Sequence, residues 1–297
     1  MRAPVFSVIV PFHNGAEFLG EAIASLQGQS LGDWEALLID DASTDGAVAL
    51  ARAACRADPR LRLLHEPGRT RPRGAGATRN LGLAVARGRH VAFLDADDRW
   101  LPAKLARQKV VFDAGADIVF GAYRRIDAHG RALGEVGARP ELRWRDALDG
   151  NPIGCLTGAY RRARFPQARM PRRAVHEDYA FWLALLRQGV EARGLPEVLA
   201  EYRVRPGSRS SCKWRGARAV WQILGEEEIG LPRQLLCFAR YAGGALARRM
   251  PSALGCGFSA ARVADAGSAG GPVRRVPSPT EAAGCDRPSA ARLLDTD

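Results

Sequence analysis

The sequence predicts an α/β fold in which a doubly wound, mostly parallel sheet is flanked by helices. Four short, largely apolar runs fall within the first 100 residues, the first of them rich in β-branched residues, and segments with helical spacing separate them. Such alternation with short connections is typical of parallel sheets. The chain has 297 residues, of which 46% are hydrophobic and 26% charged. This composition excludes collagen-like, coiled-coil and wholly disordered proteins.

The first two expected strands, residues 5–11 and 35–39, are largely apolar runs rather than alternating ones, which indicates burial on both faces. Residues 61–65 and 90–94 are expected as the third and fourth strands. The helices expected between them repeat apolar side chains three and four residues apart. These helices are residues 16–27, 48–55 and 77–86, and a loop rich in glycine, arginine and proline precedes the last of them at 67–76.

Beyond residue 100 the alternation is less regular. We expect further elements in the order helix, strand, helix, followed by two amphipathic C-terminal helices. They are residues 105–112, 117–125, 177–188, 213–228 and 235–249. From Pro251 onward alanine, glycine, serine and proline dominate without any sustained period, which predicts a disordered tail at 251–297.

The formal net charge of +12 belongs to one part of the chain. Basic and acidic residues balance in 1–100 and in 251–297, so residues 101–250 carry the whole excess. A basic segment beside a neutral one predicts contact with something anionic. Most of the basic residues are arginines, which a GC-rich genome would also produce.

Neither a membrane span nor a secretion signal is evident. No run of 18 apolar residues occurs, and the N-terminus lacks the long apolar stretch and cleavage site of a signal peptide. We therefore expect a cytoplasmic protein with reduced thiols. The six cysteines include no CxxC pair and match no zinc spacing, and Cys155 is expected in the core.

Polar clusters follow three of the four N-terminal strands. Ligands of open parallel sheets bind at the carboxyl ends of the strands, so the clusters should line one crevice. An alternative is that they cap the following helices, but three clusters on one edge favour a site. The polar residues concerned are His13 and Asn14 after Pro11, Asp40, Asp41 and Ser43, and Asp95, Asp97 and Asp98.

The acidic cluster that follows residues 90–94 predicts a metal site. Asp95 and Asp97 are one residue apart and can reach the same hard cation, leaving its other positions for phosphate oxygens. Asp41 is placed to accept hydrogen bonds from a base or ribose. Arg79, early in its helix, could face a diphosphate. A dinucleotide fingerprint is absent after the first strand, and no P-loop motif occurs in the sequence.

Seven motifs follow one another along the chain: SVIVPFHN, LIDDASTDG, GATRNLG, FLDADD, NPIGCLTGAYRR, HEDYAFWLALLRQG and AEYRVRPGSRSSCKW. In this order and spacing they resemble the motifs of family 2 glycosyltransferases of the GT-A fold. The last three resemble the branch of that family that acts in bacterial polysaccharide assembly, including teichuronic acid and lipopolysaccharide side chains. The resemblance covers residues 5–245. It implies a catalytic domain at 1–210, with a nucleotide-sugar-binding half at 1–100 and an acceptor half at 101–210, followed by helices at 211–250.

The resemblance also implies roles for single residues. Asp97 would bind Mn²⁺ or Mg²⁺. Asp95 would lie near the metal, and Asp98 would support Asp97. The family commonly has tyrosine where this chain has His13, which puts the choice of nucleotide in doubt. The residues implied to bind the nucleotide sugar are Pro11, His13, Asn14, Asp41, Ser43, Arg79, Asp95 and Arg203. The implied partners are a nucleotide-sugar donor, a UDP-sugar by preference, and a lipid-linked or polysaccharide acceptor at the inner-membrane surface.

Glu177 and Asp178 match the family's Glu-Asp pair, in which Asp178 is the expected catalytic base. A base would take the proton of the acceptor hydroxyl as that oxygen attacks the anomeric carbon. With one base and no second carboxylate as nucleophile, we expect displacement with inversion. Acidic residues at this position could instead complement the dipole of the helix that starts here.

The stretch 203–218 is strongly basic. It could be a solvated loop, or a lid or cradle for a diphosphate built from Arg203, Ser208, Arg209 and Ser210. The helices that follow carry aromatic, leucine and arginine side chains, which suit either packing on the catalytic domain or docking on an anionic membrane face.

Two other functions compete with glycosyl transfer. A nucleotidyltransferase would need a glycine-rich, lysine-containing phosphate loop after the first strand, and residues 12–15 offer none. A non-catalytic or nucleic-acid-binding protein would use the basic segment 101–250. The acidic crevice argues against nucleic acid as a partner.

Overall fold

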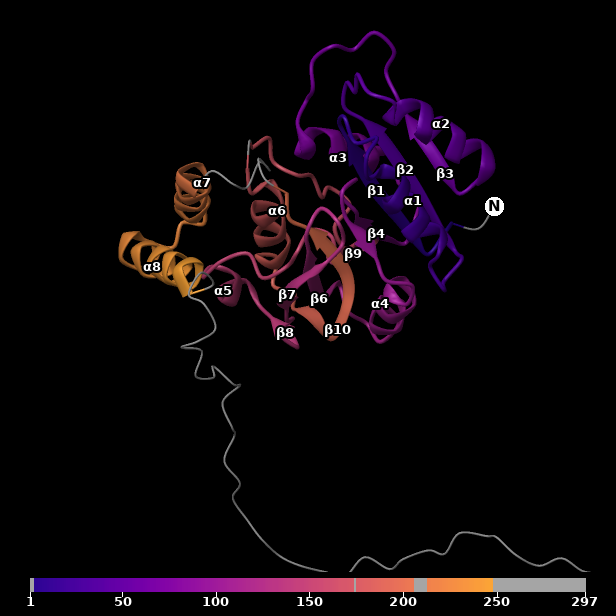
Figure 1. The fold of residues 1–297 in the computed structure, drawn as a ribbon. Coiled ribbons are helices and arrows are strands. Elements are labelled where there is room, and N and C mark those ends of the chain that lie inside the picture. The colour runs from indigo at the N-terminus through magenta and orange to yellow at the C-terminus, as the bar shows by residue number, and fades with distance from the viewer. Residues whose placement is uncertain (1–2, 174, 206–212, 248–297) are drawn as a thin grey trace, which may run out of the picture. The chain divides into compact units, whose positions relative to one another are not determined.

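The computed structural model describes residues 3–173, 175–205 and 213–247 (Figure 1). The tail predicted to be disordered lies outside these residues, as do Ser208, Arg209 and Ser210. Within them, ten strands form one sheet in the order β3-β2-β1-β4-β9-β6-β10-β5, with β7 paired to β6 and β8 to β10. The strands are β1 (Phe6–Phe12), β2 (Trp34–Asp40), β3 (Leu61–Leu64), β4 (His90–Phe93), β5 (Arg99–Trp100), β6 (Ile118–Ile126), β7 (Ala132–Val136), β8 (Glu141–Leu142), β9 (Ala159–Arg161) and β10 (Ala192–Arg203).

The first four strands form the parallel half of the sheet that the sequence predicts. Phe6 of β1 lies opposite Trp34 of β2 and His90 of β4, and β2 pairs in parallel with β3. The chain order therefore reverses between β1 and β4, which is the switch point where ligands of such sheets bind.

The second half of the sheet is mixed. Strands β6 and β10 are parallel, whereas β5, β7, β8 and β9 run antiparallel to their neighbours. The sequence pattern did not predict β10, because Pro196 interrupts its apolar run. The register of β10 on β6 slips at the same place, between Leu195 and Val198. Proline cannot donate to a ladder of hydrogen bonds, so it interrupts both the pairing and the apolar run.

Helices cover both faces of the sheet. Side chains that alternate along β1, β2 and β4 enter two separate apolar cores, which confirms that these strands are buried on both faces. One core packs against α1, α2 and α4, and the other against α3, α5, α6, α7 and α8. The helices are α1 (Leu19–Gln27), α2 (Ala47–Ala57), α3 (Ala75–Val85), α4 (Lys104–Asp113), α5 (Trp144–Ala147), α6 (Glu177–Leu186), α7 (Lys213–Glu226) and α8 (Leu231–Ala247).

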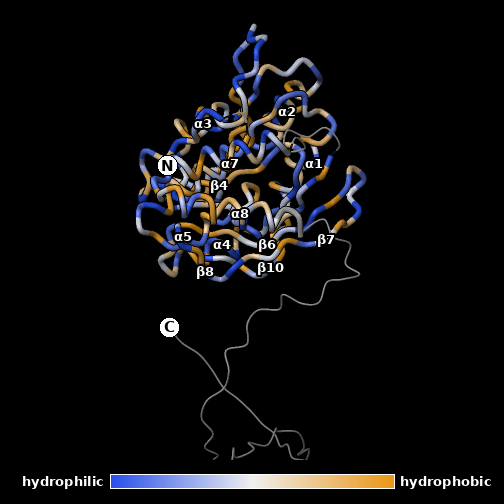
Figure 2. The backbone as a smooth tube through the Cα atoms, turned by 90° about the vertical axis from the view of Figure 1, so that its left-hand side faces the viewer, coloured by the Kyte–Doolittle hydropathy of each residue, from blue (hydrophilic) through white to orange (hydrophobic). Residues whose placement is uncertain are grey.

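Helix α3 packs closely on the sheet at a glycine. A Cβ at Gly82 would come within 2.7 Å of Ile39 Cδ1 and 2.9 Å of Ile9 Cδ1, so a larger residue would require these isoleucine side chains to move. The loop that leads into α3, residues 65–74, projects from the top of the molecule in Figure 1 and is coloured mostly hydrophilic in Figure 2. The packing of Gly82 against Ile9 and Ile39 holds α3 next to β1 and β2.

Candidate active site

The loops after β1 and β2 are tied together at the sheet edge. The main-chain N–H of Asn14 donates to Ser43 Oγ (3.1 Å), and the N–H of Thr44 donates to Asn14 Oδ1 (2.7 Å). His13 Nδ1 lies 2.7 Å from the main-chain oxygen of Asp41, which requires the Nδ1–H form. His13 and Asn14 are exposed, whereas Pro11 is buried inside β1. The predicted nucleotide-binding residues of these two loops therefore do lie together.

Asp41 anchors the loop that precedes α3. Its two carboxylate oxygens accept the main-chain N–H groups of Arg73 (2.7 Å) and Gly74 (2.9 Å), and its side chain is buried. Gly74 has a φ of +89°, a conformation that glycine adopts without strain. That Asp41 binds a base or ribose stays a prediction, since the bonds found here fix the loop.

Arg79 joins the acidic cluster after β4 to the start of α6. Its guanidinium is buried and donates to Asp95 Oδ1 (2.5 Å) and to Glu177 Oε1 (2.9 Å). Burial alone would lower the pKa of Arg79, but the charges of Asp95 and Glu177 keep that pKa well above its usual value. Gly76 permits this contact, because a Cβ there would lie 2.9 Å from the Pro171 oxygen.

The three carboxylates of the acidic turn after β4 have different hydrogen-bond partners. Asp97 Oδ2 accepts a hydrogen bond from Arg205 (2.6 Å). Asp98 is buried, and its Oδ1 accepts the main-chain N–H of Arg203 (2.8 Å), while its Oδ2 has no partner in the described part of the chain. Burial, with Asp97 and Asp95 adding their charge, raises the pKa of Asp98 well above its usual range.

Arg203 fastens this turn to the rest of the fold. Its side chain is buried and donates to the main-chain oxygens of Asp97 (2.9 Å) and Ala128 (2.9 Å) and to Glu21 Oε2 (2.6 Å). Its guanidinium also lies 4.4 Å from the ring centre of Phe18. All its nitrogens therefore serve the protein itself, which makes Arg203 a positioning residue for the acidic turn.

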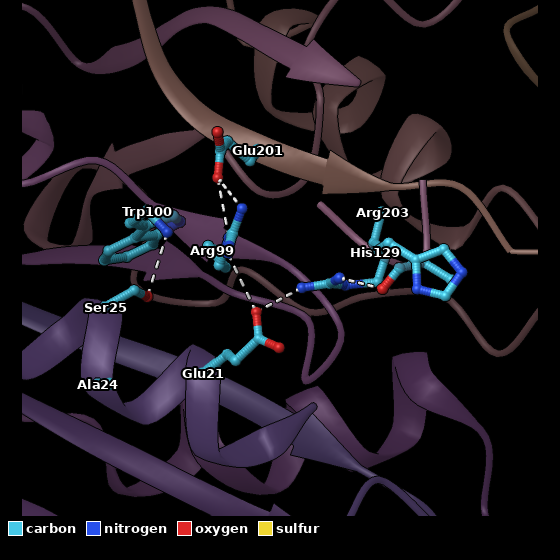
Figure 3. Close-up of a pocket in the computed structure, with 9 residues that line it drawn as sticks. Glu21, Ala24, Ser25, Arg99, Trp100, His129, Glu201 and Arg203 are labelled. Atoms are coloured by element: carbon cyan, nitrogen blue, oxygen red, sulfur yellow. Dashed lines mark hydrogen bonds and ion pairs between the residues drawn. The ribbon is translucent and has the colours of Figure 1, made fainter. Parts of the chain in front are cut away.

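Arg203 lines a cavity of about 510 Å³ together with residues of α1, β5 and β10 (Figure 3). Its charged lining groups are paired with one another: Arg99 contacts both Glu201 (2.6 Å) and Glu21 (3.2 Å), and Glu21 also contacts Arg203. Arg203 is the one predicted site residue in this lining. None of the three aspartates of the acidic turn lines this cavity, so it is distinct from the predicted donor crevice.

Helix α6 presents the expected catalytic base. His176, which precedes α6, has a left-handed φ of +59°, and Glu177 and Asp178 form the first turn. Asn151 Nδ2 donates to Asp178 Oδ2 (2.9 Å). Burial in the first place and the neighbouring Glu177 raise the pKa of Asp178, although Arg79 and His176 oppose the shift. A half-buried carboxylate with a raised pKa is suited to general base catalysis.

The residues found near the site include some that sequence reasoning had not singled out. Asn151 lies in a quoted motif and Arg205 in the basic stretch, but neither had been given a role, and Glu21 gave no signal at all. Cys155 is buried as predicted, and burial raises the pKa of its thiol. Among the described residues, no three histidine, cysteine or acidic groups converge as a metal site.

Comparison with known proteins identifies the chain as a glycosyltransferase of the GT-A fold. Residues 7–166 match the family model of Glycosyl transferase family 2, and the chain belongs to that family. The fold class and the enzyme class predicted from the sequence are thereby confirmed.

Relatives of known name support this assignment. The chain is 35% identical over 250 residues to TuaG of Bacillus subtilis, named as a teichuronic acid biosynthesis glycosyltransferase, covering 83% of this chain and 98% of TuaG. It is 30% identical over 223 residues to WfgD of Escherichia coli, covering 74% of this chain and 85% of WfgD. WfgD is named as a UDP-Glc:α-D-GlcNAc-diphosphoundecaprenol β-1,3-glucosyltransferase.

Two solved structures share the fold. TarS of S. aureus, residues 1–349 in complex with UDP-GlcNAc, superposes with a TM-score of 0.63 at 21% identity, covering 82% of this chain and 72% of that one. A mannosyltransferase of Pyrobaculum calidifontis, solved with GDP-Man and Mn²⁺, superposes with a TM-score of 0.60 at 21% identity, covering 83% and 76%.

Proposed function

We propose that this chain transfers a sugar from a UDP-sugar to a lipid-linked acceptor in the assembly of a bacterial surface polysaccharide. The observation that carries the proposal is Arg79, which joins Asp95 of the acidic turn to Glu177 beside Asp178. The names of TuaG and WfgD support the pathway and the acceptor, and the UDP-GlcNAc complex of TarS supports the donor. Such an acceptor resides in a membrane, so we also propose that the enzyme works at the membrane surface.

The acidic turn suits a divalent cation by its chemistry. Carboxylate oxygens are the ligands that Mg²⁺ and Mn²⁺ prefer, and Oδ2 of Asp98 is a buried acceptor without a partner in the described residues. Asp97 and Asp95 would hold the ion, with Asp98 behind them. When bound, such an ion neutralises charge that develops on a leaving diphosphate.

The chain's own residues supply the proton transfer. Asp178 takes the proton of the acceptor hydroxyl while that oxygen bonds to the anomeric carbon and the bond to the nucleoside diphosphate breaks. Asn151 orients the carboxylate of Asp178. Glu177 is held by Arg79 and is not free to act as a second base or nucleophile. We therefore propose a single displacement with inversion at the anomeric carbon.

We propose that one half of the catalytic domain binds the donor and the other half binds the acceptor. Residues 1–100 bind the donor, with His13, Asn14 and Ser43 in contact with the nucleotide. Residues 101–210 bind the acceptor beside Asp178, and the helices of 211–250 lie beyond them. The continuous sheet, in which β4 pairs with β9 and β9 with β6, joins the two halves.

A donor-binding measurement separates this function from a purely structural one. UDP, GDP, CDP and TDP, each with Mn²⁺ or EDTA, are tested for a rise in melting temperature, because a ligand that binds the folded state stabilises it. We expect a rise with UDP that EDTA and Asp97→Ala abolish. Transfer from UDP-glucose to a synthetic GlcNAc-diphospholipid, with the product anomer read by NMR, then tests the reaction. No shift with any nucleotide, or a retained anomer, would overturn the corresponding part of the proposal.

A further inference from the structure

Helix α8 packs through one face and exposes another that is almost wholly apolar. Cys237 is buried, and the ring of Phe238 packs edge-on against Trp221 of α7 at 5.3 Å. On the outer face, Leu231 is 61% exposed, Leu235 53% and Leu236 51%. The other outer residues are also exposed and uncharged: Pro232, Ala239, Ala242 and Gly243. We define this outer face, from Leu231 to Gly243, as the α8 stripe.

Such a stripe is unusual on a surface that faces only water. Single exposed leucines are common, but a continuous apolar helix face marks a surface that something covers. Figure 1 shows α8 at the outside of the described fold, beyond α5. In the described part of the chain, no helix is both long and apolar enough to cross a bilayer. The stripe is therefore suited to lying along an interface.

The charges on helix α8 itself favour an anionic surface. Helix α8 contains no acidic residue, and Arg233 and Arg240 are exposed along the edge of the stripe. Arg215 and Arg218 of α7 are exposed as well. An apolar helix face edged by arginines is the pattern of helices that rest in the headgroup region of a membrane. Each such basic residue near an anionic leaflet adds to the attraction.

The contacts of α8 lead directly to the catalytic base. Arg240 lies 3.2 Å from Asp149, and a Cβ built at Gly150 would lie 3.8 Å from the ring of Tyr241. The next residue, Asn151, donates to Asp178. Three consecutive residues thus connect α8 to the carboxylate that we assign to proton removal. A membrane bound at α8 would lie on the side of the molecule that receives the acceptor.

We propose that the α8 stripe docks the enzyme on an anionic lipid bilayer. The inference deepens the proposed function, on whose lipid-linked acceptor it rests. The stripe inserts its leucines at the headgroup boundary while Arg233 and Arg240 face anionic headgroups. It thereby presents the acceptor side of the site to a substrate that is held in the same bilayer.

Vesicle sedimentation of the full chain tests the docking without donor or acceptor. We expect binding to phosphatidylcholine vesicles that contain phosphatidylglycerol, and little binding to phosphatidylcholine alone. The variant L235E/L236E should lose at least about tenfold in binding, because it places two carboxylates on the face that enters the membrane. The variant R233Q/R240Q should lose about tenfold on the anionic vesicles. Leu133→Glu is the matched control, since Leu133 on β7 is also 50% exposed, and its binding should equal that of the unaltered chain.

Three results would overturn the proposal. They are absence of vesicle binding by the unaltered chain, equal binding by L235E/L236E, and a dimer in light scattering that L235E/L236E dissociates, which would assign the stripe to a second copy. Circular dichroism establishes that each variant is folded. Transfer to a water-soluble acceptor should survive L235E/L236E, whereas transfer to a vesicle-held acceptor should fall. If the proposed transferase function is wrong, neither acceptor will receive a sugar, but the vesicle binding will be unchanged.

Discussion

Arg205 donates a hydrogen bond to Asp97 Oδ2 at 2.6 Å, so the carboxylate expected to bind a divalent cation faces a positive charge of the chain itself. The guanidinium of Arg205 also lies 5.3 Å from the ring centre of Phe18. A metal ion held by Asp97 would carry the same sign of charge as Arg205. Arg205 would therefore oppose metal binding at Asp97.

Replacing Arg205 by glutamine should strengthen Mn²⁺ binding to the full chain. Partly exposed ion pairs contribute up to about 1 kcal/mol, which corresponds to a gain of up to about fivefold in affinity. Calorimetry or Mn²⁺ electron paramagnetic resonance measures it without turnover. Lys109→Gln is the control, since Lys109 forms a similarly exposed pair with Asp113 within α4. Weaker Mn²⁺ binding in R205Q would show that Arg205 does not oppose the metal, and unaltered binding in Asp97→Asn would remove Asp97 from the metal site.

Arg79→Met should destabilise the fold strongly. The substitution leaves Asp95 and Glu177 without their shared partner, and loss of one member of a buried ion pair costs about 3–5 kcal/mol. The midpoint of urea unfolding measures the change. The double variant R79M/E177Q should recover part of the loss, because it removes one of the uncompensated charges. A loss below about 1 kcal/mol for R79M would mean that the bridge does not hold the two halves of the site together.

The pH dependence of turnover should show an acid limb that belongs to Asp178. A general base must be deprotonated, so activity is lost as the pH falls through its pKa. Burial and Glu177 raise that pKa, which places the limb above the value of about 4 for an exposed aspartate. Glu177→Gln should move the limb to lower pH. Asn151→Ala should move it to higher pH, since the lost hydrogen bond stabilises the charged form. Shifts in the same direction would assign the limb to another group.

The outline of this site was predictable from sequence, whereas its internal bonding was not. The strands that precede His13, Asp41 and Asp95 are largely apolar runs, and parallel strands bring their carboxyl ends to one edge. Arg79 and Arg203 were expected to face the donor, but in the structure both are buried and bonded to the protein. A guanidinium has five donors and can serve carboxylates far apart in the chain, so its partners depend on tertiary packing that periodicity does not encode. Likewise, amphipathic spacing predicted α8 but not which apolar residues would face outward.

His90 should make the stability of the fold sensitive to acid. It is buried at the start of β4, stacked on Phe112 with ring centres 3.9 Å apart, and its Nδ1 has no partner in the described residues. Burial in the first place, with the charges of Arg161 and Arg89, lowers its pKa to about 4. Between pH 6.5, the ordinary pKa of histidine, and about pH 4, His90 is therefore protonated in the unfolded chain and neutral in the folded chain.

The free energy of unfolding should consequently fall as the pH drops from about 6.5 towards 4, by up to about 3 kcal/mol from this residue. His90→Phe removes the titrating group and keeps a ring for Phe112 to stack on, so it should reduce the fall by that amount while changing stability little at pH 8. Urea unfolding of both proteins across this pH range gives the difference directly. Parallel stability curves for the two proteins would show that another group causes the acid sensitivity, since the folded chain would then protonate His90 as readily as the unfolded chain does.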